Sequence, residues 1–93
     1  MPIKHCKMNG KTMASLDDLY DQLSIPLSLP KHFGRNLDAL WDVLSTDVEG
    51  PFETVWKHAG DSKKLMGRDY DRAVKLLKNL QKERDDFKLK IEK

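Results

Sequence analysis

Hydrophobic positions along this chain follow two different periods. In three stretches, apolar side chains return every three or four residues and so line one face of a helix. In three others they alternate with polar side chains, as in a strand with one buried face. The predicted helices cover residues 16–23, 36–45 and 68–82, and the predicted strands cover residues 3–8, 52–56 and 87–91. A short helical turn is also expected to begin at Asp61.

Local signals mark where these elements end. Ser15 opens the run S-L-D-D, which fits a capping box in which a hydroxyl and a carboxylate satisfy free amides. Asn36 precedes the second helix in the same way and is predicted to be its N-cap. Two prolines in residues 24–30 predict that the first helix stops near Ser24 and that an extended loop follows. Asn9-Gly10 predicts a tight turn after the first strand.

The order strand, two helices, strand, helix, strand predicts a small α/β fold. Helices between successive strands permit parallel pairing, and right-handed connections would pack them against the sheet. A length of 93 residues suits one domain, residues 1–93, with a modest core.

Composition favours a soluble protein of the cytoplasm. The chain is 39% hydrophobic and 34% charged, and no apolar run approaches the roughly 20 residues that span a bilayer, so we expect no membrane partner. The start, M-P-I-K-H-C-K, lacks the apolar region of a secretory signal. Cys6 is the only cysteine, so an internal disulfide is excluded, and in the predicted strand it faces inward.

Charge is segregated along the chain although its net value is only +2. Residues 1–15 carry three lysines and no acids, and residues 57–93 carry twelve basic and seven acidic side chains. Residues 16–56 carry eight acidic side chains against Lys31 and Arg35. If the fold keeps this middle part on one side, the molecule has a polar surface; ordinary solvated charge is the alternative.

Two acids of the middle part stand out by their spacing. Asp38 and Asp42 are four residues apart, so both carboxylates project from one face of the second predicted helix. The apolar residues of that helix lie on a different face; they are Leu37, Leu40, Trp41 and Leu44. This pattern predicts a helix that builds the core with its inner face and presents negative charge with its outer face.

Catalysis and cofactor binding are disfavoured. His32, Asp38 and Asp42 could perform acid–base chemistry, but no serine or cysteine is placed as a nucleophile beside them. A phosphate-binding glycine loop is absent, and His5 has no second ligand at metal spacing. We therefore expect no enzyme, no cofactor and no metal.

Nucleic acid is a weaker candidate partner. The helix over 68–82 carries five basic side chains, which phosphate binding would use, but nearby acids dilute them and no RNA-binding aromatic motif accompanies them. An amphipathic helix with a basic solvent face explains the pattern better, and weak RNA binding stays an alternative.

The run P-K-H-F-G-R-N-L-D-A-L-W-D resembles the loop and second helix of the barstar family. An N-G turn, S-L-D-D-L and P-F-E-T-V-W fall in matching order, so that the resemblance covers nearly the whole chain. It implies a three-stranded parallel sheet packed by about four helices. It also implies an intracellular bacterial protein, a monomer when free, that blocks the active site of a ribonuclease or nuclease toxin in the manner of an immunity protein.

The resemblance also implies which residues bind the partner. Asp42 would enter the nuclease active site, with Asp38 beside it and Trp41 between core and interface. The full set is Asp42, Asp38, His32, Trp41, Phe33, Gly34, Asn36, Asp47 and Asn79. Three sites depart from the family pattern: His32-Phe33 replaces two tyrosines, Thr46-Asp47 replaces a Gly-Trp pair, and Asn79 replaces a glutamate. We therefore expect a different cognate enzyme; the alternative is a related binding module whose partner is not a nuclease.

Overall fold

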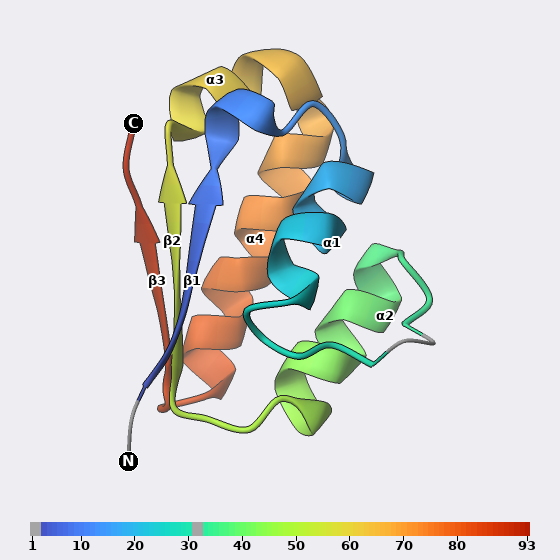
Figure 1. Cartoon of the computed structure of the whole chain (residues 1–93), viewed down its shortest axis with the longest axis vertical. Coiled ribbons are helices and arrows are strands. Elements are labelled where there is room, and N and C mark those ends of the chain that lie inside the picture. Colours follow the sequence, from blue (N-terminus) through green and yellow to red (C-terminus); the bar gives the residue numbers. More distant parts are fainter. Residues whose placement is uncertain (1–2, 31–32) are drawn as a thin grey trace.

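Three strands form a single layer in the computed structural model, which describes residues 3–30 and 33–93 (Figure 1). They are β1 (Lys4–Asn9), β2 (Phe52–Lys57) and β3 (Phe87–Ile91). Their order across the sheet is β1-β2-β3, and both pairs are parallel. The three predicted strands and the parallel sheet that the resemblance implied are confirmed.

Helices supply the crossovers that parallel strands require. The described residues form four α-helices, namely α1 (Leu16–Ser24), α2 (Leu37–Asp42), α3 (Ala59–Met66) and α4 (Arg68–Glu83). The first two connect β1 to β2, and the other two connect β2 to β3. In Figure 1, α1, α2 and α4 lie on one side of the sheet, and α3 lies at the end where β2 finishes. The α/β prediction with about four helices is confirmed, and α3 extends well beyond the single turn expected at Asp61.

The core fills the space between the sheet and these helices. Cys6 and Met8 of β1, Phe52 and Trp56 of β2, and Phe87 of β3 are each at most 1% exposed. The helices contribute a set of fully buried leucines to the same cluster, namely Leu19, Leu23, Leu40, Leu44, Leu77 and Leu80. These residues belong to the apolar faces that the sequence periods predicted.

The opposite face of the sheet carries no helix (Figure 1). This is uncommon, because parallel sheets are usually covered on both faces. Val55 is only 8% exposed there and lies in register between Lys7 and Lys90. Both lysines are exposed, and long lysine stems can shield an apolar side chain while their ammonium groups stay in water.

A buried hydrogen-bond chain joins α3 to the sheet. The Trp56 indole donates to the Ser62 hydroxyl at 2.9 Å, and that hydroxyl donates to the Gly10 carbonyl at 3.0 Å. A side chain at Gly10 would collide with the carbonyl oxygens of Lys57 and His58, which explains the glycine. Both polar side chains are therefore satisfied inside the core.

Local structure differs from expectation at three places. The turn at Asn9-Gly10 is a 3-10 helix, η1 (Gly10–Thr12), with the Asn9 side chain as its cap. The loop over 24–30 is folded into successive turns rather than extended; the amide of Leu27 donates to the carbonyl of Leu23, and Leu27 is buried. The second helix has α geometry only to Asp42 and continues as a π-helix, η2 (Val43–Asp47), which no sequence signal indicated.

Candidate partner-binding site

Asn36 organises the entry into α2. Its side-chain oxygen accepts a hydrogen bond from the amide of Ala39 at 2.8 Å, as the predicted N-cap requires. Its Nδ2 donates to the carbonyl of Gly34 at 3.3 Å, so the same side chain also ties the preceding loop to the helix. A Cβ on Gly34 would lie 3.2 Å from that of Ala39, a contact with little room to spare.

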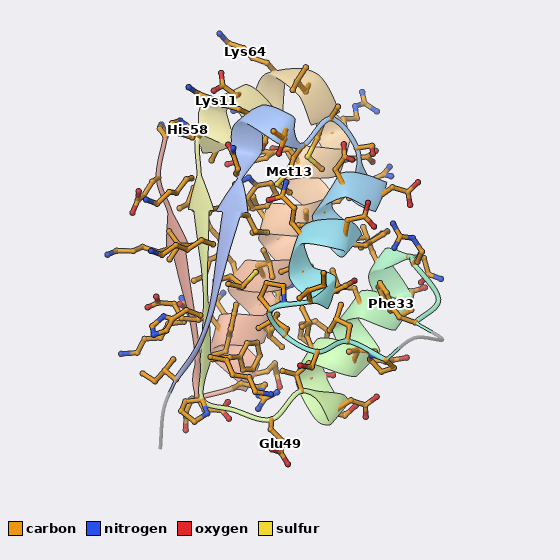
Figure 2. The ribbon with its side chains drawn as sticks, in the orientation of Figure 1. Lys11, Met13, Phe33, Glu49, His58 and Lys64 are labelled. Atoms are coloured by element: carbon orange, nitrogen blue, oxygen red, sulfur yellow. The ribbon has the colours of Figure 1, made fainter. Side chains whose placement is uncertain are left out.

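Phe33 marks the other end of this loop, which passes close to α1 (Figure 2). It is half-buried, and its ring meets that of Tyr20 edge-on, with centroids 5.4 Å apart. Its neighbour His32, also expected to bind the partner, lies outside the described residues.

The outer face of α2 presents two carboxylates. Asp38 in the first turn and Asp42 at the last position are both exposed, whereas Leu40 is fully buried. Trp41 is half-buried and packs against the core. The helix therefore has the predicted division between a core face and a negatively charged face. Near the helix N-terminus, Asp38 also interacts favourably with the helix dipole.

The change from α to π geometry takes place directly after Asp42. The amide of Val48 donates to the carbonyl of Val43 five residues earlier, at 3.0 Å. The hydroxyls of Ser45 and Thr46 both donate to the carbonyl of Asp42. Asp47 is exposed at the end of the π-helix, and short π segments are frequent at functional sites.

Arg84, just beyond α4, holds the end of the π-helix. Its Nη1 donates to the carbonyls of Leu44 and Val48 at 2.7 and 2.8 Å. Its Nε and Nη2 donate to the two carboxylate oxygens of Asp86, each at 2.8 Å. These bonds lower the pKa of Asp86, and the guanidinium also lies 4.8 Å from the centroid of the Phe52 ring. Sequence analysis missed Arg84, because its partners are 36 and 40 residues away.

A groove of about 530 Å³ separates the N-terminal ends of α1 and α2. Asn36 and Asp38 line it from one side, and Asp17 and Tyr20 line it from the other. Arg35, another residue that sequence analysis passed over, lies between them and also lines a second hollow beside Phe33. The loop and the start of α2 thus form one continuous surface with α1, with the carboxylates of Asp17 and Asp38 on opposite sides of the groove.

Comparison with known proteins shows which family has this arrangement of loop and helices. A family model described as "Barstar (barnase inhibitor)" matches residues 3–92. The chain belongs to the barstar family. A Bacillus subtilis (strain 168) protein described as "Putative ribonuclease inhibitor YrdF" is 35% identical over 86 residues, which cover 91% of this chain and 94% of that protein. The resemblance seen in the sequence is confirmed, and it connects the chain to a family of inhibitors.

Asn79 lies on a different helix from the other barstar-family positions expected to bind a partner. It is exposed on α4, which packs against α2. It lines a hollow of about 320 Å³ whose other residues all come from α4, three of them lysines. Asn36 and Asp38 share the groove beside α1, and Asn79 is not part of it.

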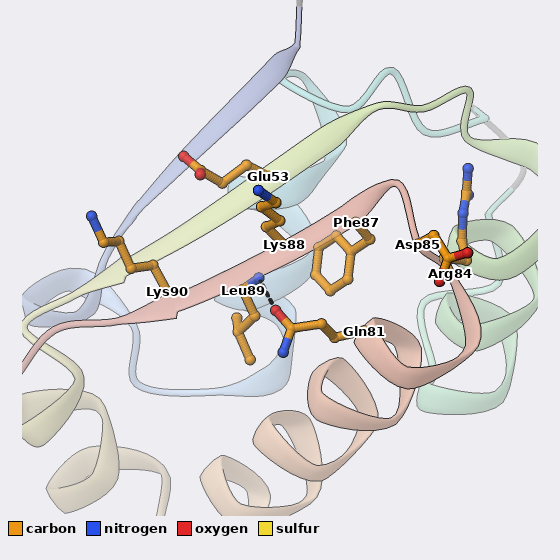
Figure 3. Close-up of a pocket in the computed structure, with 8 residues that line it drawn as sticks. All are labelled: Glu53, Gln81, Arg84, Asp85, Phe87, Lys88, Leu89 and Lys90. Carbon is orange, nitrogen blue, oxygen red and sulfur yellow. Dashed lines mark hydrogen bonds between the residues drawn. The ribbon is translucent and has the colours of Figure 1, made fainter.

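A further hollow, of about 470 Å³, follows the free edge of β3 in this barstar fold (Figure 3). There the Gln81 side-chain oxygen accepts from the amide of Leu89 at 2.8 Å, which satisfies an edge donor. Among residues 3–30 and 33–93, no cluster of His, Cys, Asp and Glu has the grouping needed to bind a metal ion. No helix in this part of the chain has the length and apolar character to cross a membrane.

Proposed function

We propose that this protein binds a ribonuclease or nuclease toxin and blocks its active site with the carboxylates of Asp42 and Asp38. The observation that carries the proposal is the exposure of both acids on a helix whose opposite face is locked into the core. A ribonuclease must hold a phosphodiester, so its cleft concentrates cationic side chains. Carboxylates placed where phosphates would bind can form charge-assisted and often bidentate hydrogen bonds with those groups.

Preorganisation supports the same proposal. The Asn36 cap fixes the start of the helix, and the bonds from Ser45, Thr46 and Arg84 fix its end. A partner-binding helix that is already ordered loses little conformational entropy when the complex forms. The acids are therefore presented to a cationic cleft at small entropic cost.

The surrounding residues form the rim of the proposed interface. The role of His32 rests on the family resemblance alone, and Asn79 is placed at the periphery because it lies on α4 and not on the helix that carries Asp38 and Asp42. The departures at Asp47 and Asn79 favour a cognate enzyme different from barnase. The proposed rim consists of Phe33, Gly34, Asn36, Trp41, Asp47, His32 and Asn79.

A titration of ribonuclease activity tests the proposal. Barnase is the first probe, and a nuclease captured from the source organism on the immobilised protein is the second. The wild-type protein should abolish the activity of one of them near one molar equivalent, and the variant with Asp38→Asn and Asp42→Asn should not. Equal inhibition by the double variant would exclude the acidic mechanism. Failure of the wild type against both enzymes would favour a non-nuclease partner.

A further inference from the structure

The loop before α2 is attached to α1 by an arginine with an unusual backbone. Arg35 directly precedes the cap residue Asn36 and has φ of 51°, in the left-handed region. A residue with a Cβ rarely adopts this conformation unless its surroundings hold it there. All the polar contacts found for the Arg35 side chain are made to α1.

Three hydrogen bonds define this attachment. Nη2 of Arg35 donates to the carbonyl oxygen of Asp17 at 3.0 Å, to Asp17 Oδ1 at 3.4 Å and to Asp21 Oδ1 at 2.9 Å. The two carboxylates are largely exposed, so the ion pairs themselves contribute little to folding. Their effect is geometric, because one guanidinium nitrogen that bonds a main-chain carbonyl and two side chains ties the loop to a defined point on α1.

Tyr20 provides the surface against which the loop rests. It is 2% exposed and therefore fixed within the core. The Arg35 guanidinium lies 5.6 Å from the centroid of its ring, and Phe33 meets the same ring edge-on at 5.4 Å. Residues on both sides of Gly34 thus contact one buried aromatic side chain.

Charge alone would predict the opposite role for Arg35. Residues 16–56 are strongly acidic, and Arg35 is one of only two basic side chains among them. A cationic partner would be repelled by it, so its removal would make the surface more attractive to such a partner. The contacts with α1 instead indicate that Arg35 strengthens binding, because they order the loop that the partner contacts.

We propose that Arg35 is a positioning residue, which holds residues 33–36 against α1 before the partner binds. This inference rests on the proposed function, since it concerns the same surface. Loops are ordinarily the most mobile parts of a fold, and a loop that becomes ordered only on binding lowers affinity. Arg35 removes that loss by ordering the loop in the free protein.

Amide hydrogen exchange in the free protein is the first test. Arg35→Ala should increase the exchange rates of two hydrogen-bonded amides at least tenfold, namely Phe33, which donates to the carbonyl of Pro30, and Ala39, which donates to Asn36, while leaving those of β2 unchanged. Arg72→Ala is the matched control, because Arg72 is an exposed arginine on α4 that pairs with Asp69 at 3.5 Å. It changes the net charge equally and should leave exchange in the loop unaltered. Wild-type exchange rates in Arg35→Ala would overturn the proposal.

Affinity for the ribonuclease used in the inhibition titration is the second test. Arg35→Ala should weaken binding at least tenfold, Arg35→Lys should weaken it less, and Arg72→Ala should stay within twofold of wild type. Unchanged or tighter binding by Arg35→Ala, as charge alone predicts, would overturn the positioning role. The exchange measurement needs no partner, so failure of the acidic mechanism is distinguishable from failure of the Arg35 proposal.

Discussion

The backbone carbonyl of Asp42 accepts hydrogen bonds from other residues, and the carboxylate of Asp42 takes no part in them. The hydroxyls of Ser45 and Thr46 donate to its carbonyl, and the side chain is exposed. The carboxylate is therefore available to a partner, and removing it should leave the helix intact. Binding and folding can be separated at this residue.

Truncation of Asp42 tests this separation. Asp42→Ala should weaken binding to the inhibited ribonuclease by about 2–5 kcal/mol, because cationic groups of the partner would be left buried and unpaired. The free energy of unfolding should change by no more than about 0.5 kcal/mol, as is usual at an exposed position. Calorimetric titration and urea unfolding measure the two quantities.

The control for Asp42→Ala is Lys64→Ala, at an exposed lysine of α3 (Figure 2). It should leave inhibition nearly unchanged, because α3 lies at the end of the sheet away from α2 and outside the proposed interface (Figure 1). Wild-type binding by Asp42→Ala, or a larger loss for the lysine variant, would contradict the acidic mechanism.

The ion pair between Asp86 and Arg84 predicts how the free energy of unfolding depends on pH. Its bonds with Arg84 lower its pKa in the folded protein, so its stabilising effect is fully present above the unfolded-state pKa of about 4. That effect is lost as the pH falls through the lower folded-state pKa. Asp86→Asn should therefore be less stable than wild type at pH 7, and the difference should shrink toward pH 2. Urea unfolding across this range measures it, and a difference independent of pH would contradict the assignment.

At the scale of elements, the segment from α2 through η2 is held at both ends by other parts of the chain. Arg35 fixes the loop before it to α1, and Arg84 bonds the carbonyls of Leu44 and Val48 at its far end. A helix of six residues has little stability of its own. Its geometry therefore depends on these tertiary contacts.

Replacement of Arg84 should show this dependence. Arg84→Met keeps the length and apolar stem of the side chain but leaves two carbonyls without their donor, at a cost of about 1–3 kcal/mol each. Arg72→Met, in an exposed ion pair on α4, should cost less than about 1 kcal/mol. Thermal and urea unfolding compare the two variants, and equal stability would show that water replaces the guanidinium freely.

The elements themselves could be predicted from sequence where one period governs a whole stretch. The alternation over 87–91 and the apolar spacing of α4 were sufficient, and Ser15 and Asn36 marked helix starts through local bonds. The π-helix was not predictable, because no local pattern indicated it and Arg84, whose guanidinium bonds the carbonyl of Val48 at its end, lies far along the chain. The turns over 24–30 were missed because the prolines indicated only that the helix ends and not that Leu27 becomes buried.

The candidate site was predictable only in part. The i,i+4 spacing was enough to place Asp38 and Asp42 on a shared exposed face. The role of Arg35 depends on its left-handed backbone and on contacts 14 to 18 residues away, which no spacing rule indicates.

At the scale of the whole molecule, the charge segregation seen along the chain is only partly a separation in space. The acids of α1 and α2 lie on the helical side, and Lys7 and Lys90 lie on the open face of the sheet beside Val55. The helical side also carries α4, whose exposed face is rich in lysine. A cationic partner is therefore attracted to the surface of α1 and α2 and repelled from the open face of the sheet and from the basic face of α4, which orients the encounter.

The association rate should reveal this orientation. Raising the ionic strength from about 0.01 M to 0.5 M shortens the range of electrostatic attraction several-fold, so association with a basic ribonuclease should slow by roughly tenfold or more. The dissociation rate should change much less, since it depends on close contacts. Stopped-flow kinetics separate the two rates, and an association rate insensitive to salt would contradict electrostatic steering.

The reactivity of the Cys6 thiol can report local opening or unfolding of the protein. Its thiol is fully buried, donates to the carbonyl of Gln22 on α1, and has its pKa raised to about 11 by burial. A thiol reagent can reach it only when β1 separates from α1, and no other cysteine competes for the reagent. Labelling of the folded protein should be on the order of a thousandfold slower than labelling in concentrated urea. Its dependence on urea would then distinguish fraying of β1 from unfolding of the entire chain, without any engineered probe.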